Sequence, residues 1–370
     1  MTKLISKRLD VRVGNASYPI VVGVDLEKEL LSVVQKEPCS RIAIITDGTV
    51  RRLWGTQLVR TLKRAKKSVE LFSFPSGERN KNQKTVTAMQ HELMKRGFGR
   101  DTLISAFGGG VVGDVAGFVA ATYVRGVPYI HVPTTLLAMV DSSIGGKVGV
   151  DTPYGKNTVG AFWQPKAVIS DLRFLKGLPK TQLISGLLEA IKSFFTSDSG
   201  SLSLAKMLDL DDPLRTANVL ERIVYASVAH KAGVIARDER EENERKVLNF
   251  GHTIGHAIEF LSGFTIPHGC AVGYGMLVET KIAELLGHLS AKDRAAVHDY
   301  LAAFGIRGNA ISRFSIPAIL KTTRSDKKTR GGIPHYVLLS SLGSVYKKNG
   351  RYAHPVKDAV VSRALRSFAS

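Results

Sequence analysis

Cysteine is scarce in this chain of 370 residues, and Cys39 and Cys270 are its only examples. They lie far apart and show no spacing typical of a zinc knuckle or a redox pair, so a disulfide scaffold is excluded. Long apolar runs are missing as well. The longest, such as residues 115–121, are interrupted well before the roughly 20 residues that a membrane-spanning helix needs. The first ten residues carry charges throughout and lack the apolar core of a signal peptide, so we expect a soluble, cytoplasmic protein without a membrane partner.

Acidic side chains are in short supply, because 32 Asp and Glu stand against 52 Lys and Arg and give a formal net charge of +20. Such an excess favours anionic partners through the field of the whole protein. The basic residues are scattered in small clusters, without an aromatic stacking motif or a groove-reading module. Nucleic acid is therefore not the favoured partner. A merely basic surface, or attraction of a small anionic substrate, is the simpler interpretation.

The organisation of the chain changes near Leu178–Pro179. Before this point, short apolar runs alternate with amphipathic stretches, a pattern in which parallel strands alternate with helices. The expected strands are residues 41–46, 69–74, 102–107 and 129–132, and the expected helices are 50–67, 84–96 and 115–124. Beyond it, apolar positions recur with a helical period over residues 183–195, 216–237, 246–262 and 270–288. We therefore predict an α/β domain with a parallel sheet over residues 1–180 and an all-α domain over residues 181–370.

A glycine-rich turn lies between one expected strand and the helix that follows it. The segment 108–113 reads Gly-Gly-Gly-Val-Val-Gly and satisfies the G-x-G-x-x-G spacing, in the context that a dinucleotide fingerprint requires. Glycines there let backbone amides approach a pyrophosphate at a helix N-terminus. The acid expected about 20 residues further on is missing, so a tight structural turn is an equally good interpretation. Asp47, just past an expected strand, is an alternative acid for a ribose hydroxyl, or else a helix N-cap.

Two histidines, His252 and His256, stand four residues apart on one face of an expected helix, within reach of one ion or one ligand. No glutamate follows the first of them, so a peptidase would lack its general base. His268 follows in a turn, and Glu189 lies in another expected helix. Three such ligands with a fourth position open would form a catalytic metal site. The alternative is a pair of merely buried histidines, with neighbouring glycines that let helices pack closely.

A third cluster comprises residues 140–147, which read Val-Asp-Ser-Ser-Ile-Gly-Gly-Lys, and residues 154–157, which read Tyr-Gly-Lys-Asn. Backbone amides, hydroxyls and ammonium groups in such stretches suit phosphate and carboxylate oxygens. Each lysine alone is typical of a solvated surface. Together with the glycine-rich turn upstream, the cluster indicates an anionic ligand.

These segments together resemble the 3-dehydroquinate synthase family of sugar-phosphate cyclases, from about Asp47 to His335. The resemblance rests on blocks that occur in the family's order: GGGVVGD (108–114), AGF (116–118), YVRG (123–126), VPTTLL (132–137), VDSSIGGK (140–147), GKN (155–157), GAFWQP (160–165), LNFGHTIGH (248–256) and HG (268–269). It implies an N-terminal Rossmann-like NAD-binding domain, a C-terminal helical metal- and substrate-binding domain, and a homodimer.

The implied reaction converts 3-deoxy-D-arabino-heptulosonate 7-phosphate, a phosphorylated sugar acid, to 3-dehydroquinate and phosphate. It belongs to the shikimate pathway and so to aromatic amino acid and chorismate biosynthesis. In the family, it proceeds by transient oxidation with NAD, elimination of phosphate, return of the hydride and an intramolecular aldol closure. This chemistry classes the enzyme as a phosphorus–oxygen lyase.

The resemblance also implies a set of site residues. Zinc, or alternatively cobalt, would be held by Glu189, His252 and His268, which leaves His256 to the substrate. With Asp47 added from the strand-end argument, the expected NAD contacts are Ser76, Glu78, Lys81, Gly110, Val111, Val112, Gly113, Asp114, Thr134, Thr135, Asp141, Lys147, Lys156, Phe174, Leu175, Lys176 and Gly177. The expected substrate contacts are Arg125, Lys147, Asn157, Lys231, Arg245, Asn249, His256 and one of Lys327 and Lys328. Catalytic roles fall to Asp141, Lys147, Asn157, Lys192 and His256.

One departure from the family pattern concerns the metal. Cys270 stands where the family's His-Gly is normally followed by a glutamate, which predicts the loss of a carboxylate that would orient His268. Every predicted metal ligand and charged substrate contact is nevertheless retained, so we expect an active enzyme.

Two other enzyme classes and one binding protein remain as alternatives. A cyclase that makes a cyclitol from sedoheptulose 7-phosphate or glucose 6-phosphate would not need to bind a carboxylate, yet Arg245, Asn249 and His256 match the pattern for a carboxylated substrate. A metal-dependent polyol dehydrogenase would lack the blocks at 140–147 and 155–157. A basic nucleic-acid-binding protein on an inactive scaffold would account for the net charge, and its binding would depend steeply on salt.

Overall fold

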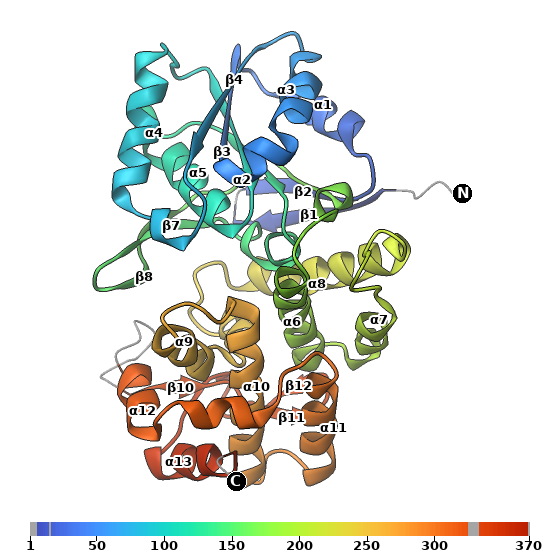
Figure 1. Ribbon diagram of the computed structural model, residues 1–370, viewed down its shortest axis with the longest axis vertical. Coiled ribbons are helices and arrows are strands. Elements are labelled where there is room, and N and C mark those ends of the chain that lie inside the picture. The colour runs from blue at the N-terminus through green and yellow to red at the C-terminus, as the bar shows by residue number, and fades with distance from the viewer. Residues whose placement is uncertain (1–5, 15, 325–332, 369–370) are drawn as a thin grey trace. The chain divides into compact units, whose positions relative to one another are not determined.

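The computed structural model describes residues 6–14, 16–324 and 333–368, which form two compact units (Figure 1). The first unit runs to Leu178 and also includes Asp211–Ala232, and the second comprises Pro179–Leu210 and the chain from Gly233 onward. The predicted substrate contacts Lys327 and Lys328 lie outside the described residues. The assignment of residues 1–180 and 181–370 to two functional domains stays a prediction.

The first unit is built on a seven-stranded sheet, in the order β1-β2-β9-β6-β5-β3-β4. Its strands are β1 (Lys7–Val13), β2 (Ala16–Gly23), β3 (Arg41–Asp47), β4 (Ser68–Phe74), β5 (Thr102–Gly108), β6 (Tyr129–Pro133) and β9 (Val168–Asp171). The four strands expected from the sequence are all present and pair in parallel, which confirms the α/β class. The difference is at one edge, where β1 and β2 form an antiparallel hairpin that makes the sheet mixed.

Helices cover both faces of this sheet because side chains alternate along each buried strand. In β3, Ile42 and Ile44 join an apolar cluster with two helices, whereas Ala43 and Ile45 join a second cluster with two others. The first pair of helices is α1 (Glu27–Lys36) and α3 (Thr56–Lys63), and the second pair is α4 (Gln83–Lys95) and α5 (Gly110–Thr122). The central strand β5 is buried at every position, as expected for a parallel strand covered on both faces.

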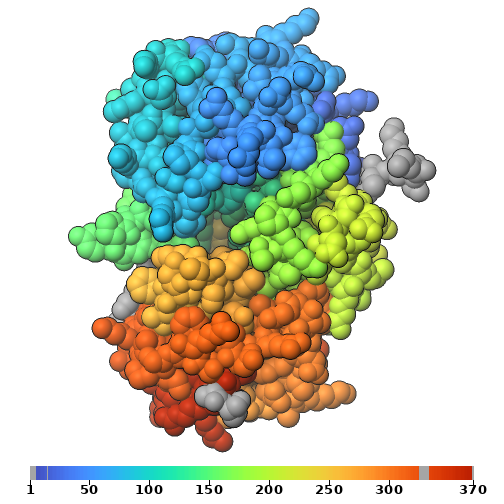
Figure 2. Space-filling view, viewed as in Figure 1, coloured from blue at the N-terminus to red at the C-terminus, as the bar shows by residue number. Residues whose placement is uncertain are grey.

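Two parts of the first unit differ from the expected pattern. The helix expected over 50–67 is instead a short α2 (Gly48–Val50), a π-helical turn over Arg51–Gly55 and then α3. Strands β7 (Lys147–Thr152) and β8 (Gly155–Phe162) form an antiparallel hairpin that the sequence pattern did not indicate. Its tip projects from the surface of this unit in Figures 1 and 2, and Tyr154 there is almost fully exposed.

The second unit is mainly helical, as predicted. Its helices are α6 (Lys180–Thr196), α7 (Leu202–Met207), α9 (His252–Leu261), α10 (His268–Leu285), α11 (Ala291–Ala302), α12 (Ile316–Arg324) and α13 (Asp358–Arg366), and α8 (Ala217–Arg237) lies mostly in the first unit. Two short strand pairs were not expected. They are β10 (His335–Tyr336) with β13 (His354–Pro355), and β11 (Leu339–Ser341) with β12 (Ser344–Val345). None of the described helices combines the length and the apolar character that a membrane crossing requires.

Candidate metal and nucleotide sites

Close contacts between helix backbones bring the predicted metal ligands together in the second unit. A Cβ on Gly269, next to His268, would lie 1.9 Å from the carbonyl oxygen of Ser185 in α6, and the Gly269 amide donates a hydrogen bond to the Ser185 hydroxyl at 2.9 Å. Glu189 follows one helical turn after Ser185 and therefore lies beside His268. Only glycine, which has no Cβ, permits this approach.

A second glycine contact holds α9 against α10. A Cβ on Gly275 would lie 1.8 Å from the carbonyl oxygen of Gly251, and a Cβ on Gly255 would lie 2.9 Å from the Cα of Val272. Gly251 has a φ of +77°, and its amide donates a hydrogen bond to the buried carboxylate of Glu279 at 2.8 Å. The close packing that the glycines predicted is confirmed, and it fixes where α9 begins.

Glu189 is the centre of the resulting cluster. Its Oε1 lies 3.8 Å from Nε2 of His252 and 3.8 Å from Nε2 of His268. The carboxylate is buried, and Oε1 accepts no hydrogen bond from any described residue, whereas Oε2 accepts one from Lys192 Nζ at 2.5 Å. A buried oxygen left in this state is costly. Two tetrahedral zinc ligands lie about 3.4 Å apart, so the residues fit a divalent cation held among these three atoms.

The other nitrogen of each imidazole indicates its tautomer. Nδ1 of His252 lies 3.2 Å from the carbonyl oxygen of Phe250, and Nδ1 of His268 lies 3.1 Å from Oε2 of Glu259. A carbonyl and a carboxylate accept hydrogen bonds, so we assign a proton to each Nδ1. Each Nε2 then keeps the lone pair that a metal needs.

The sequence argument missed Glu259, which contacts His268. The expected loss of an orienting carboxylate at Cys270 is offset, because α9 supplies a carboxylate at Nδ1 of His268. Helical spacing was the available signal, since Glu259 follows His256 by three residues on the same helix. Burial raises the pKa of the Cys270 thiol to about 11, so this side chain stays protonated at neutral pH.

His256 completes a group of three imidazoles. Its ring centroid lies 5.3 Å from that of His252 and 5.8 Å from that of His268, and the three histidines offer ligand nitrogens within 4.8 Å of one another. Two ligand sets are therefore present in this unit. One comprises the three histidines, and the other comprises Glu189, His252 and His268.

Two predicted substrate contacts lie in the segment that precedes α9. Arg245 is buried, and its guanidinium donates a hydrogen bond to the carbonyl oxygen of Glu239. The Asn249 side chain donates to the carboxylate of Glu241. Asp238 organises the segment, because its carboxylate accepts hydrogen bonds from three backbone amides, including that of Arg245 at 2.9 Å. Partial burial acts to raise the pKa of Asp238, but these amides lower it overall.

In the first unit, the glycine-rich turn joins the end of β5 to α5. A Cβ on Gly109 would lie 3.0 Å from the Thr135 side chain, and one on Gly110 would lie 3.1 Å from the Ser142 hydroxyl. Thr134 is buried, and its hydroxyl has no hydrogen-bond partner among the described residues. The turn and the Thr134–Thr135 segment, which lie at the carboxyl ends of two neighbouring strands, thus fit a ligand with hydrogen-bonding groups.

Gly113 has a packing role, because a Cβ added at this position would lie 2.9 Å from the His131 ring. This glycine lets α5 pack against β6. Burial lowers the pKa of His131 to about 4, so the imidazole stays neutral inside the sheet. The neighbouring Val112 is fully buried in the core, and Val111 packs against the same cluster.

Two ion pairs are formed among four further residues of the predicted NAD set. Lys81 Nζ lies 2.5 Å from an Asp114 carboxylate oxygen, and Lys156 Nζ lies 2.8 Å from a Glu78 carboxylate oxygen. Burial acts to lower the pKa of Lys81, but the carboxylates of Asp114 and Glu78 raise it overall, so the ammonium keeps its charge. Asp151 was not among the residues predicted for this site, and its carboxylate accepts a hydrogen bond from the Asn157 amide at 2.7 Å.

Asp47 has a structural role at the end of β3. One of its carboxylate oxygens accepts hydrogen bonds from the amides of Thr49 at 2.8 Å and Val50 at 3.0 Å, and from the Ser76 hydroxyl at 2.9 Å. The side chain therefore caps α2, as one of the two interpretations expected. Its contact with a ribose stays a prediction.

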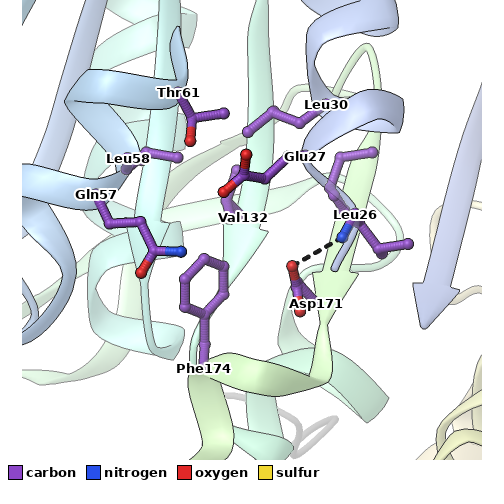
Figure 3. Close-up of a pocket in the computed structure, with 10 residues that line it drawn as sticks. Leu26, Glu27, Leu30, Gln57, Leu58, Thr61, Val132, Asp171 and Phe174 are labelled. Carbon is purple, nitrogen blue, oxygen red and sulfur yellow. Dashed lines mark hydrogen bonds between the residues drawn. The ribbon is translucent and has the colours of Figure 1, made fainter. Parts of the chain in front are cut away.

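The turn at 174–177 begins in the core, where the Phe174 ring packs edge-on against Trp54 and Phe107. Leu175 is also buried, whereas Lys176 is exposed and Gly177 has a φ of +77°. Figure 3 shows Phe174 at the wall of a cavity of about 20 Å³ that Leu26 and Leu58 also line. This volume holds about one water molecule.

Lys231 and Asp141, two predicted site residues far apart in sequence, meet in the first unit. The Lys231 ammonium donates hydrogen bonds at 2.7 Å to the backbone oxygen and to a carboxylate oxygen of Asp141. Asp141 lies in a π-helical turn over Ala138–Ser142, an irregularity that often marks functional sites.

Backbone strain is concentrated around Arg125. Val124 and Arg125 have φ values of +43° and +71°, a conformation that costs energy and is most unusual for a β-branched residue. Trp163 holds this turn, because its Nε1 donates to the Val127 oxygen at 3.0 Å and a Cβ on Gly126 would lie 2.7 Å from its ring. The Trp163 amide also donates to the carbonyl oxygen of Gly146, beside Lys147, at 2.8 Å.

Comparison with solved structures defines the class. A 2-deoxy-scyllo-inosose synthase complexed with carbaglucose-6-phosphate, NAD+ and Co2+ superposes with a TM-score of 0.88 at 27% sequence identity, over 98% of this chain and 100% of that chain. A 2-epi-5-epi-valiolone synthase from Streptomyces hygroscopicus subsp. jinggangensis, with NAD+ and Zn2+ bound, has the same fold with a TM-score of 0.85 at 24% identity, over 97% and 98% of the two chains. The chain is thus a member of the sugar-phosphate cyclase superfamily.

Sequence comparison identifies the family. The family described as 3-dehydroquinate synthase N-terminal matches residues 71–185, and its C-terminal counterpart matches residues 186–329. The 3-dehydroquinate synthase of Pelobacter propionicus is 38% identical over 90% of this chain and 94% of its own length, and that of Acidithiobacillus ferrooxidans is 37% identical over 98% of each. The chain belongs to the 3-dehydroquinate synthase family.

Proposed function

We propose that this protein converts 3-deoxy-D-arabino-heptulosonate 7-phosphate to 3-dehydroquinate and phosphate, with NAD and a divalent metal as cofactors. The observation that supports this most directly is the Glu189 Oε1 atom, buried without a hydrogen bond among the described residues and 3.8 Å from two imidazole nitrogens. Membership of the 3-dehydroquinate synthase family supports the choice of reaction.

The metal ligands in this proposal are Glu189, His252 and His268. The alternative set of three histidines would leave the Glu189 oxygen unsatisfied beside a cation, which is the costlier arrangement. When bound, a divalent metal polarises a substrate oxygen as a Lewis acid. Lys192 neutralises the second Glu189 oxygen and Glu259 orients His268, so His256 is left to bind the substrate.

The nucleotide contacts in this proposal lie in the first unit. The amides of Gly110, Val111 and Val112 in the first turn of α5 and the Thr134 hydroxyl offer hydrogen bonds, and the Lys81–Asp114 and Lys156–Glu78 pairs order the segments beside them. When bound, NAD accepts a hydride from the substrate and returns it within one turnover.

The substrate carries a phosphate and a carboxylate, and both units offer cationic and amide side chains for them. In the first unit these are Arg125, Lys147, Asn157 and Lys231, and in the second they are Lys192, Arg245, Asn249 and His256. Side chains of these types bind phosphate and carboxylate groups and fix their orientation, so the phosphate of the substrate itself can remove the neighbouring proton. The protein then mainly positions the substrate and neutralises charge.

A cyclitol synthase is the second candidate, because the 2-deoxy-scyllo-inosose synthase structure superposes over the whole chain. Buried Arg245 argues for the carboxylated substrate, since a guanidinium binds a carboxylate through two parallel hydrogen bonds. A sugar phosphate without a carboxylate would leave this buried charge without that partner.

The test is release of inorganic phosphate by the purified protein with NAD and zinc, before and after chelation. 3-Deoxy-D-arabino-heptulosonate 7-phosphate, sedoheptulose 7-phosphate and glucose 6-phosphate are compared as substrates. Chelator-sensitive release from the first alone is the expected result. Release only from one of the other two would assign a cyclitol synthase, and no release from any of them would refute the proposal. The same preparation, examined by sedimentation, tests the predicted homodimer.

A further inference from the structure

A second, larger pocket lies in the second unit and shares no lining residue with the metal cluster. Its volume is about 590 Å³, within the range of small-molecule sites. The residues that line it follow the end of α10 or belong to the segment between β10 and α13, and they include Leu286, His288, Tyr346, Lys348, Arg351 and His354. Nothing in the proposed reaction uses them.

One wall of this pocket is aromatic. The His288 imidazole stacks on the Tyr346 ring, with centroids 3.7 Å apart and planes 15° from parallel. The His354 ring lies 5.0 Å from that of Tyr346, and its Nε2 is 3.2 Å from the Tyr346 carbonyl oxygen. These rings, together with Leu286 and Pro355 in the same lining, suit a planar, largely apolar ligand body.

The polar side of the pocket is basic. Lys348 and Arg351 are exposed, no acidic residue lines the pocket, and neither side chain makes an ion pair within the part of the chain that the structure describes. Their backbones form an antiparallel bridge, in which the Lys348 amide donates to the Arg351 oxygen at 3.3 Å and the Arg351 amide donates to the Lys348 oxygen at 3.0 Å. Like charges directly opposite each other across such a pair destabilise the fold, and an anion between them would offset this cost.

Burial and the positive charge of the pocket both lower the pKa values of its two histidines. Burial first, and then the Lys348 ammonium, lowers the pKa of His288. The pKa of His354 is lowered by burial, with the hydrogen bond to Tyr346 opposing this and with His288, His335 and Lys348 adding to it. Lys348, Arg351 and the imidazoles of His288 and His335 are the charged and titratable groups that surround His354 here.

We propose that this pocket binds a small organic anion, a phosphate or carboxylate carried on a planar ring. The ring packs against Tyr346 and its neighbours, and the anionic group binds Lys348 and Arg351. The site is independent of the catalytic reaction, because it shares no residue with the metal cluster or with the predicted nucleotide contacts.

Phenyl phosphate is a suitable probe, titrated into the full-length protein while the imidazole resonances are followed by NMR. Binding should shift the His288 and His354 signals and raise both pKa values, because a bound anion stabilises the protonated imidazoles. Benzyl alcohol, which is neutral, should not bind, and inorganic phosphate should bind more weakly than phenyl phosphate.

Substitutions of the two basic residues test whether they bind the anionic group. Lys348→Gln and Arg351→Gln should each weaken binding of phenyl phosphate about tenfold, as expected for the loss of one charge-assisted hydrogen bond. Lys292→Gln, an exposed lysine on α11, removes the same charge elsewhere in the unit and should leave the affinity unchanged. Without ligand, Lys348→Gln should not lower the thermal midpoint, because it relieves a like-charge pair. Unchanged affinity in both pocket variants, or shifts confined to His252, His256 and His268, would overturn the proposal.

Discussion

The metal cluster is assembled by helices whose backbones touch, whereas the predicted nucleotide contacts come from strand ends and a projecting hairpin. In the second unit, Gly269, Gly275 and Gly255 set the distances between helices. The spacing of the proposed metal ligands therefore follows from the helix packing. In the first unit, ion pairs such as Lys81–Asp114 and the strained turn at Arg125 set the geometry locally. The two regions should therefore fail in different ways when residues are changed.

The largest effect is expected for His268→Ala, which removes one of three proposed ligands. Bound zinc, measured by atomic emission, should be lost, and phosphate release should fall about 10³-fold or more because the Lewis acid is gone. His91→Ala, an exposed histidine on α4, is the control and should change neither quantity. Normal zinc content in His268→Ala would refute the ligand assignment.

Gly275→Ala tests whether helix contact holds the cluster. Its Cβ would lie 1.8 Å from the Gly251 oxygen, so α9 and α10 must separate, and the free energy of unfolding should fall by about 3 kcal/mol. Zinc affinity should fall with it. Gly233→Ala in α8 is the matched control, because its Cβ meets only the flexible end of Arg237 at 3.5 Å. That variant should be neutral or more stable by up to about 1 kcal/mol in urea denaturation.

Glu259→Gln tests whether Glu259 orients His268, while all three proposed metal ligands are kept. The amide fills the same space but no longer fixes the tautomer of His268, so zinc affinity should fall about 10- to 100-fold while the fold is kept. Competition with a chelator measures the affinity, and Glu284→Gln on α10 provides a carboxylate control. Equal affinities in the two variants would show that Glu259 does not orient His268.

Trp163→Phe makes the corresponding change in the first unit. The variant loses the hydrogen bond to the Val127 oxygen and part of the packing on Gly126, so Arg125 is held less firmly. We expect KM for the phosphorylated substrate to rise about fivefold, with a smaller change in kcat and no loss of zinc. A loss of zinc would contradict the division of roles between the two regions.

Alkylation of Cys270 tests the packing of α10 near His268 and is not expected to depend on the bound metal or substrate. Burial raises the pKa of this thiol to about 11 from 9.0. In a Cys39→Ser background, iodoacetamide should therefore react about 100-fold more slowly at pH 8 than with a thiol of pKa 9, and the rate should rise about tenfold per pH unit up to pH 10. A fast reaction at pH 8 would show that α10 opens near His268.

Local patterns in the sequence predicted the features that depend on neighbouring residues. The four expected parallel strands and the glycine-rich turn were found because apolar runs and glycine spacing are local signals. The β7–β8 hairpin was missed, since it depends on Gly149 and Gly160 allowing two backbones to meet across the ladder. Glu259 was missed for a related reason: only the return of the chain from α9 to α10 brings it to His268.

The predicted site residues divide in the same way. The histidines and Glu189 could be selected by residue type, and the family resemblance already implied the set of Glu189, His252 and His268. The physical argument for that set needs the position of the Glu189 oxygens, which follows from the contact between Ser185 and Gly269. The basic pocket could not be predicted at all. Lys348 and Arg351 look like ordinary surface residues in sequence, and only the tight bridge between them places their charges together.

The glycine contacts between α9 and α10 have a consequence for the order in which the protein would fold and bind a metal ion. Where Gly275 meets Gly251 and Gly255 meets Val272 the two backbones touch directly, so the packing of the helices fixes the positions of His252 and His268. For the metal site proposed above, folding and ion binding would then be separate events, and a chain that lost its ion would keep the geometry of the site. The ion retained there would be set by the spacing of the ligands and by the metals available, rather than by the energy of folding.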